Sequence, residues 1–220
     1  GDTPFISSET LQKMLAERAK NAVIVLGFEA EKPGGYGRLV MDGDRLDAIV
    51  EANDCSEKQR EISFCNSGVI CASAPLLFSL LDEVGNDNAN GEYYLTDIVA
   101  IASARDLSCT AIKCSEAETM GVNSRTDLAD AEAVFQANAR MAAMENGVTL
   151  TAPDTVHFAF DTHIGRDAIV EPNVFFGPAV TIESGATIRA FSHLEGCHVA
   201  RNCQVGPYAR LRPGAELDLG

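Results

Sequence analysis

The sequence predicts two folds in one chain: an α/β unit with a layered, largely parallel sheet, and then a parallel β-helix, with a long helix between them. In the first half, short apolar runs of strand length alternate with amphipathic stretches of helix length. Over residues 127–147, apolar side chains recur at helical spacing between a Ser124 capping pattern and an Asn146-Gly147 stop. From residue 157 onward an apolar residue recurs every six positions, which is typical of a solenoid.

The first half carries the local signals of an α/β fold. Residues 1–6 are interpreted as the end of a strand that enters a turn at Pro4, and Ser7 and Ser8 are candidate helix caps. We expect helices or helical turns over residues 11–18, 56–61, 75–84 and 92–105. We expect strands over residues 22–28, 38–41, 46–50, 69–72 and 107–114. Because helices alternate with mostly buried strands, the sheet is expected to lie between helices and to be largely parallel.

A glycine-rich stretch and a hairpin form the candidate binding region. Gly34-Gly35-Tyr36-Gly37 precedes two apolar runs that flank an Asp42-Gly43 turn, a strong signal for a β-hairpin. Backbone without a Cβ lets a ligand approach closely. Glu51 and Asn66 each stand at the polar end of an apolar run, where α/β proteins bind small polar molecules. A plain glycine-rich turn with two polar residues at strand ends explains the same pattern, and the residues alone leave both interpretations open.

The second half carries the most specific structural pattern in the chain. The recurring apolar residues are Phe158, Ile164, Val170, Phe176, Ile182, Ile188 and Leu194 and then, after one five-residue step, Val199, Val205, Leu211 and Leu217. Gly, Pro, Asn and small residues fill the positions between them. The pattern predicts a parallel β-helix in which each apolar residue stacks on its counterpart in the next coil.

Composition narrows the possible partners and compartments. The net charge is −15, and residues 1–147 hold 12 Lys and Arg against 24 Asp and Glu, which argues against a nucleic acid or an anionic membrane as partner. An acidic protein that binds a phosphate ester is expected to need a divalent cation. No apolar run is long enough to span a bilayer, and no signal-peptide pattern is present. The seven cysteines are odd in number and form no CxxC pair, so we expect reduced thiols in a cytoplasmic protein.

The two ends of the sequence suggest that the chain is a piece of a longer protein. It begins at Gly1 without a Met, and it stops at Gly220 inside a repeat. A solenoid cut there would leave its last coil uncovered, so the native protein is expected to continue.

A series of short motifs resembles the GlmU family, the bifunctional bacterial enzymes that make UDP-N-acetylglucosamine. The motifs span the whole chain, and their order and spacing are specific although each motif alone is weak. They are Gly1-Asp2-Thr3-Pro4, Gly35-Tyr36-Gly37-Arg38, Ile49-Val50-Glu51, Asn66-Ser67-Gly68, Gly91-Glu92-Tyr93-Tyr94-Leu95-Thr96-Asp97, Gly121-Val122-Asn123-Ser124-Arg125 and Gly206-Pro207-Tyr208-Ala209-Arg210-Leu211-Arg212-Pro213-Gly214-Ala215.

The resemblance implies a division of the chain into three parts. Residues 1–126 would be the C-terminal part of a Rossmann-like nucleotidyltransferase domain, residues 127–147 a linker helix, and residues 148–220 the start of a left-handed β-helix acetyltransferase domain. The family's glycine-rich, Lys-containing nucleotide loop precedes the first residue here, so the chain alone is expected to be inactive. The repeat region is also shorter than in some members, by about one coil.

The resemblance implies that the first domain condenses UTP with N-acetylglucosamine 1-phosphate to UDP-N-acetylglucosamine and pyrophosphate. Such phosphoryl chemistry needs positioning and charge neutralisation by Mg²⁺. Asp2 and Asn123 would bind the Mg²⁺, and Gly1 would lie beside the uridine and the metal. Without the resemblance, Asp2 is explained equally well as a turn residue and Asn123 as a neighbour of the Ser124 cap.

The resemblance also implies the sugar-binding residues of this first domain. Gly37 would donate its backbone N–H to the sugar, and Glu51 and Asn66 would bind sugar hydroxyls. Tyr94 and Thr96 would line the pocket for the N-acetyl group.

The β-helix of the family transfers an acetyl group from acetyl-CoA to glucosamine 1-phosphate, as a homotrimer with sites between subunits. Arg212 alone matches a functional position of that site, as a clamp on the sugar phosphate, a role suited to a guanidinium. The family's catalytic histidine lies in coils beyond the last residue here, so no catalytic residue is predicted in this chain. The four histidines, interpreted as coil-surface or packing residues, are His157, His163, His193 and His198.

Three alternatives remain open on the sequence. The first is a nucleotidyltransferase for glucose 1-phosphate with UTP, ATP or dTTP, although the segment of residues 92–97 favours the N-acetyl sugar. The second is a non-catalytic assembly subunit built from the same two folds, against which the intact Asp2, Glu51, Asn66 and Asn123 argue. The third is a stable, inactive core left by truncation or proteolysis.

Overall fold

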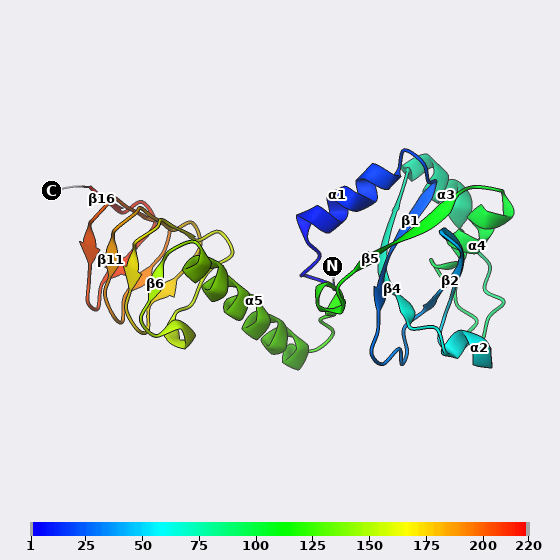
Figure 1. The fold of residues 1–220 in the computed structure, drawn as a ribbon, viewed down its shortest axis with the longest axis horizontal. Coiled ribbons are helices and arrows are strands. Elements are labelled where there is room, and N and C mark those ends of the chain that lie inside the picture. Colours follow the sequence, from blue (N-terminus) through cyan, green and yellow to red (C-terminus); the bar gives the residue numbers. More distant parts are fainter. Residues whose placement is uncertain (1, 219–220) are drawn as a thin grey trace. The chain divides into compact units, whose positions relative to one another are not determined.

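The computed structural model describes residues 2–218, and these divide after Asn123 into two compact units (Figure 1). Gly1, one of the predicted site residues, lies outside the described residues. None of the helices within residues 2–218 combines the length and apolar character that crossing a bilayer requires.

The first unit is a five-stranded sheet with helices on both faces (Figure 1). Its strands are β1 (Val23–Glu29), β2 (Arg38–Asp42), β3 (Arg45–Val50), β4 (Phe64–Ala72) and β5 (Cys109–Cys114), in the order β3-β2-β4-β1-β5. Its helices are α1 (Ser8–Glu17), α2 (Glu57–Arg60), α3 (Ala74–Leu81), α4 (Asp97–Ala104) and the short 3-10 helix η1 (Glu116–Thr119). Successive side chains of β1 alternate between the faces: Val23 and Val25 pack against α3 and α4, whereas Ile24 and Leu26 pack against Met14 of α1.

The predicted direction of the strands is wrong for the described residues. Only β1 and β5 run parallel, whereas β1 with β4, β2 with β3 and β2 with β4 are antiparallel. An antiparallel pair needs only a tight turn, and Gly43, with φ of +59°, closes such a turn between β2 and β3. The hairpin is therefore confirmed, and the Rossmann-like domain stays a prediction.

Three further segments differ from their predicted structure. Residues 92–96 form a loop before α4, because Asn88 Oδ1 accepts the N–H groups of Asn90 and Glu92 at 3.2 and 3.1 Å and stabilises a turn. Strand β4 begins at Phe64, so Asn66 lies inside the strand and not at its end. Residues 2–6, expected to end a strand, form none.

The second unit consists of helix α5 (Arg125–Glu145) and a β-solenoid (Figure 1). The predicted capping box is confirmed: Ser124 Oγ accepts the Asp127 N–H at 3.1 Å, and the Asp127 carboxylate accepts the Ser124 N–H at 2.9 Å. The solenoid strands are β6 (Thr149–Leu150), β7 (His163–Ile164), β8 (Ile169–Val170), β9 (Phe175–Phe176), β10 (Thr181–Ile182), β11 (Thr187–Ile188), β12 (His193–Leu194), β13 (His198–Val199), β14 (Gln204–Val205), β15 (Arg210–Leu211) and β16 (Glu216–Leu217), with the 3-10 helix η2 (Pro153–Thr155) near its start.

The solenoid strands form three parallel sheets that match the predicted left-handed β-helix. Their orders are β16-β13-β10-β7, β14-β11-β8-β6 and β15-β12-β9. The second residue of each strand from β7 onward is one of the predicted apolar residues, and these side chains build a single core. The five-residue step does not break the stacking, since Ile182 pairs with both Ile164 and Val199.

All seven cysteines are free thiols. Burial raises the pKa of Cys65, Cys109 and Cys197, and it raises the pKa of Cys114 to about 11. These four thiols therefore stay protonated at neutral pH and are poor nucleophiles.

Gln136 joins α5 to the first coil of the solenoid. Its buried amide accepts the N–H of Phe158 at 2.9 Å and donates to the carbonyl of the same residue at 2.7 Å. The side chain thus pairs with Phe158 as a neighbouring strand would, and both buried backbone groups depend on it.

We expect Gln136→Leu to destabilise this junction by about 2 kcal/mol, because it leaves two buried backbone groups without partners. The measurement is hydrogen exchange at the Phe158 amide, whose protection is expected to fall roughly thirtyfold. Asn138→Leu, at an exposed position of the same helix, serves as the matched control and is expected to leave protection unchanged. Equal protection in wild type and Gln136→Leu would contradict the prediction.

Glu118 of η1 connects this short helix to the start of α1. Its carboxylate accepts the Thr10 hydroxyl at 2.7 Å and the Ser7 N–H at 3.1 Å. Burial pushes the pKa of Glu118 upward, but these hydrogen bonds outweigh burial and hold the pKa below its ordinary value.

A carboxyl whose pKa is lowered by folding adds stability above its unfolded pKa and loses that contribution as the pH falls through its folded pKa. We therefore expect Glu118→Gln to unfold more easily than wild type at neutral pH, with the difference shrinking below about pH 4.5. Urea unfolding between neutral pH and about pH 4 measures this difference in unfolding free energy. Glu116→Gln, at an exposed neighbouring position, is the control. A difference that stays constant on acidification would refute the assigned role.

Candidate functional site

Glu51 is held at the end of β3 by two contacts. The Thr96 hydroxyl, buried just before α4, donates to Glu51 Oε1 at 2.9 Å. On the other side the carboxylate lies against Gly37: a Cβ on this glycine would meet Glu51 Oε2 at 3.4 Å and Oε1 at 3.5 Å. Gly37 therefore lies within van der Waals distance of the Glu51 carboxylate, and a Cβ there would be tightest against Ile49, at 3.2 Å.

Asn66 reaches the same point from β4. Its backbone N–H donates to the Gly37 carbonyl at 2.8 Å, and its side-chain Oδ1 accepts the Gly68 N–H at 3.0 Å. The fold thus brings together three residues that the sequence predicted for sugar binding, Gly37, Glu51 and Asn66, although they come from a loop, a strand end and a strand interior.

A cavity of about 460 Å³ opens beside this cluster. The residues that line it are Gly35, Glu51, Ala52, Asn53, Asn90, Glu92 and Tyr94. No basic side chain lines it, whereas two carboxylates do. Because carboxylates accept hydrogen bonds and repel anions, the cavity suits a neutral, hydroxyl-rich ligand better than a bare phosphate.

Tyr94 lines this cavity and carries a hydroxyl group. Its hydroxyl oxygen is buried, and the side chain of Asn90 lies beside it. Burial, followed by the charges of Asp54, Glu92 and Glu51, raises the pKa of Tyr94, so the hydroxyl keeps its proton. Thr96, predicted beside it in the N-acetyl pocket, is not among the lining residues and instead holds Glu51.

The two predicted metal ligands come from segments that lie together. The Asp2 carbonyl accepts the Val122 N–H at 2.8 Å. A Cβ on Gly121 would meet the Asn123 side chain at 3.6 Å and the Asp2 carbonyl at 3.8 Å. A carboxylate and an amide oxygen are hard donors of the kind Mg²⁺ prefers.

The described residues contain no group of three or more His, Cys, Asp or Glu that could hold a metal ion. Two protein oxygens nevertheless fit Mg²⁺, which usually takes its remaining ligands from waters and substrate phosphates. The donor set is thus compatible with a metal bound together with a nucleotide.

Arg212 follows β15 in the solenoid and is exposed. Its guanidinium forms no hydrogen bond or ion pair within residues 2–218. Its backbone carbonyl accepts the Ala215 N–H at 3.0 Å. The side chain is therefore free to bind an anion.

The four histidines lie on the surface of the coils or pack there. Phe175 is sandwiched between the rings of His157 and His193, with centroid distances of 4.4 and 4.7 Å. His198 Nε2 lies 3.1 Å from Glu183 Oε1, and His163 is exposed.

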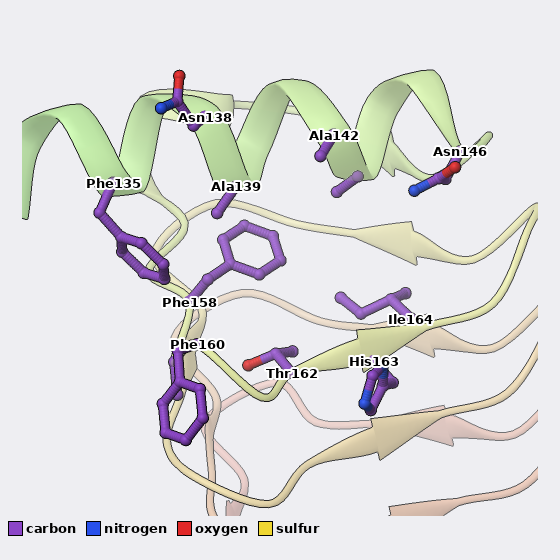
Figure 2. A pocket seen from close by; sticks show the side chains of 12 residues that line it. Phe135, Asn138, Ala139, Ala142, Asn146, Phe158, Phe160, Thr162, His163 and Ile164 are labelled. Atoms are coloured by element: carbon purple, nitrogen blue, oxygen red, sulfur yellow. The ribbon is translucent and has the colours of Figure 1, made fainter. Parts of the chain in front are cut away.

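The cavity between α5 and the first coils, about 430 Å³, is a packing groove (Figure 2). Ala139 and Phe135 on the helix face Phe158 and Ile164 of the coils across it (Figure 2). His163 is the one titratable side chain among the lining residues, so no acid–base or nucleophile pair is present.

A parallel hexapeptide-repeat solenoid that follows an α/β unit with an acidic cavity defines a two-unit protein of the hexapeptide-repeat class. Sequence comparison identifies the family within this class. The chain is 61% identical to the bifunctional protein GlmU of Jannaschia sp. strain CCS1 and 64% identical to that of Ruegeria sp. strain TM1040, in each case over 217 residues, 99% of this chain and 48% of the relative. It is 66% identical to the bifunctional protein GlmU of Cereibacter sphaeroides strain ATCC 17025 over 201 residues, 91% of this chain and 44% of the relative.

The chain belongs to the GlmU family over the region compared. It spans about half the length of the curated relatives it matches. No protein-family model matches the chain.

We expect Thr96 and Glu51 to be energetically coupled, because a hydroxyl hydrogen bond to a carboxylate is stronger than one between neutral groups. A double-mutant cycle of Thr96→Val and Glu51→Gln, followed by urea unfolding, is expected to give a coupling free energy of about 1 kcal/mol. Thr96→Ser, which keeps the hydroxyl, is the matched control. Strictly additive effects of the two substitutions would rule out the interaction.

Proposed function

We propose that the full-length protein makes UDP-N-acetylglucosamine in two steps. In the first, an acetyl group passes from acetyl-CoA to the amine of glucosamine 1-phosphate. In the second, uridylyl transfer from UTP to N-acetylglucosamine 1-phosphate releases pyrophosphate. The observation that carries the proposal is the convergence of Gly37, Glu51 and Asn66 beside a cavity suited to a hydroxylated ligand, in a chain of the GlmU family.

The sugar ring is proposed to bind in this cavity. Glu51 Oε1 already accepts the Thr96 hydroxyl, so Oε2 would accept hydrogen bonds from sugar hydroxyls. Asn66 would bind a further hydroxyl, and the backbone N–H of Gly37 would donate to a sugar oxygen. The protonated hydroxyl of Tyr94 is suited to donate to the acetamido carbonyl.

The transfer itself is proposed to be an in-line displacement at phosphorus. An oxygen of the sugar phosphate forms a bond to the α-phosphorus of UTP while the bond from that phosphorus to the bridging oxygen breaks, and pyrophosphate leaves. Asp2 and Asn123 would hold Mg²⁺, and Gly1 would lie beside the uridine. When bound, the ion neutralises phosphate charge and orients the leaving group. Because no basic side chain lines the sugar cavity, such a cation would supply positive charge at the phosphates that the cavity itself does not provide.

The solenoid is proposed to carry the acetyltransferase as a homotrimer. The exposed guanidinium of Arg212 would clamp the phosphate of glucosamine 1-phosphate through paired N–H groups. We assign no acetyltransferase base among the residues of this chain. The same proposal includes a division of the chain into a Rossmann-like nucleotidyltransferase domain (1–126), a linker helix (127–147) and a β-helix domain (148–220). It also includes a cytoplasmic location.

The test is pyrophosphate release by the full-length protein with Mg²⁺ and UTP. We expect N-acetylglucosamine 1-phosphate to be strongly preferred over glucose 1-phosphate, and Asp2→Ala to lower the rate roughly a hundredfold, since a metal ligand is lost. Asp87→Ala, in an exposed loop, is the matched control.

The other outcomes identify the alternative functions. A preference for glucose 1-phosphate would indicate a different sugar-1-phosphate nucleotidyltransferase. No release with either sugar would favour a non-catalytic assembly subunit.

A further inference from the structure

Arg38 is a buried cation without an acidic partner. Only 4% of the residue is exposed, although it begins β2 next to the glycine-rich loop. Among the described residues no carboxylate lies within ion-pair distance of its guanidinium. Burying an unpaired charge is costly, so the groups that do contact Arg38 must compensate for it.

Those groups are backbone carbonyls of the loop before β2. Arg38 Nη2 donates to the Gly34 carbonyl at 3.1 Å, and Nη1 donates to the Pro33 carbonyl at 3.4 Å and to the Tyr36 carbonyl. One guanidinium thus gathers three carbonyls of residues 33–36. A planar fork with five donors suits this task, and an ammonium does not.

The geometry of the peptide bond turns these contacts into an arrangement of donors. In a trans peptide the C=O of one residue and the N–H of the next point in opposite directions, and the described residues are trans at every bond of this loop. With three carbonyls directed at Arg38, the N–H groups of Gly34, Gly35 and Gly37 point away from it. None of these three N–H groups donates to another group in residues 2–218.

Two of these donors stand next to the acceptor of the candidate site. Gly35 lines the same cavity as Glu51, and Gly37 lies against the Glu51 carboxylate. Neutral backbone donors beside a carboxylate acceptor match a ligand that carries both hydroxyls and neutral oxygens. A phosphate would be repelled by Glu51 and Glu92 in the same cavity.

We propose that Arg38 is a positioning residue, which holds the peptide planes of residues 33–37 so that the N–H groups of Gly35 and Gly37 face the sugar of the substrate. This inference rests on the proposed function. Arg38 does not touch the substrate; it acts by orienting the loop that does.

The experiment uses the full-length protein with Arg38→Lys, Arg38→Ala and, as a matched control on the same hairpin, Arg45→Lys. Arg45 is half exposed and pairs with Asp47. We expect Arg38→Lys to raise the KM for N-acetylglucosamine 1-phosphate about tenfold and to leave the KM for UTP unchanged. The reason is that the substitution would loosen only the loop of residues 33–37, which is proposed to face the sugar. Free guanidinium at submolar concentration is expected to restore the sugar KM of Arg38→Ala. Arg45→Lys should match wild type.

A second measurement tests the loop without a substrate. Hydrogen exchange at the Tyr36 amide, which donates to the Pro33 carbonyl at 3.0 Å, is expected to be faster in Arg38→Lys than in wild type or Arg45→Lys. Unchanged exchange in Arg38→Lys, or an equal rise of both KM values, would overturn the proposal. If wild type is inactive with every sugar phosphate, the proposed function fails, and the exchange result alone decides whether Arg38 positions the loop.

Discussion

The burial of both faces of β1 is the constraint on which the first unit depends. Helix α1 covers one face, and α3 and α4 cover the other, so β1 cannot slip without exposing a full set of apolar side chains. Strand β4 pairs along β1 with Asn66 opposite Gly27, where a side chain would collide with Leu39 and Phe64. That register carries Asn66 to the carbonyl of Gly37, and the candidate site follows from it.

Negative and positive side chains are separated around the candidate site. Carboxylates line the cavity, where they can accept hydroxyls, and the nearest buried cation is turned inward onto backbone carbonyls. In the proposed reaction, side chains of the cavity would therefore not supply the charge that neutralises the phosphates. An acidic unit of this kind is suited to chemistry in which a divalent ion accompanies the nucleotide, and the oxygen donors of Asp2 and Asn123 agree with that division of tasks.

The second unit depends on stacking. Each coil adds buried apolar side chains on those of the coil before, so the solenoid extends without long-range rearrangement. Its first coil has no predecessor, and Gln136 of α5 supplies the missing hydrogen bonds to Phe158. The helix therefore acts as a cap on the repeat.

The sequence by itself determined the features that depend on local chemistry or on a strict period. The six-residue repeat predicted the solenoid and its core residues, because each coil buries one side chain per strand. The Ser124 capping box and the Asp42-Gly43 hairpin are recognisable within a few residues. The family motifs pointed to Gly37, Glu51 and Asn66. Only the tertiary structure decided the direction of the strands, the place of Asn66 inside β4, the hydrogen bond from Thr96 to Glu51 and the inward turn of Arg38. These features arise from packing between segments or from the path of a loop, and no local pattern in the sequence encodes such contacts.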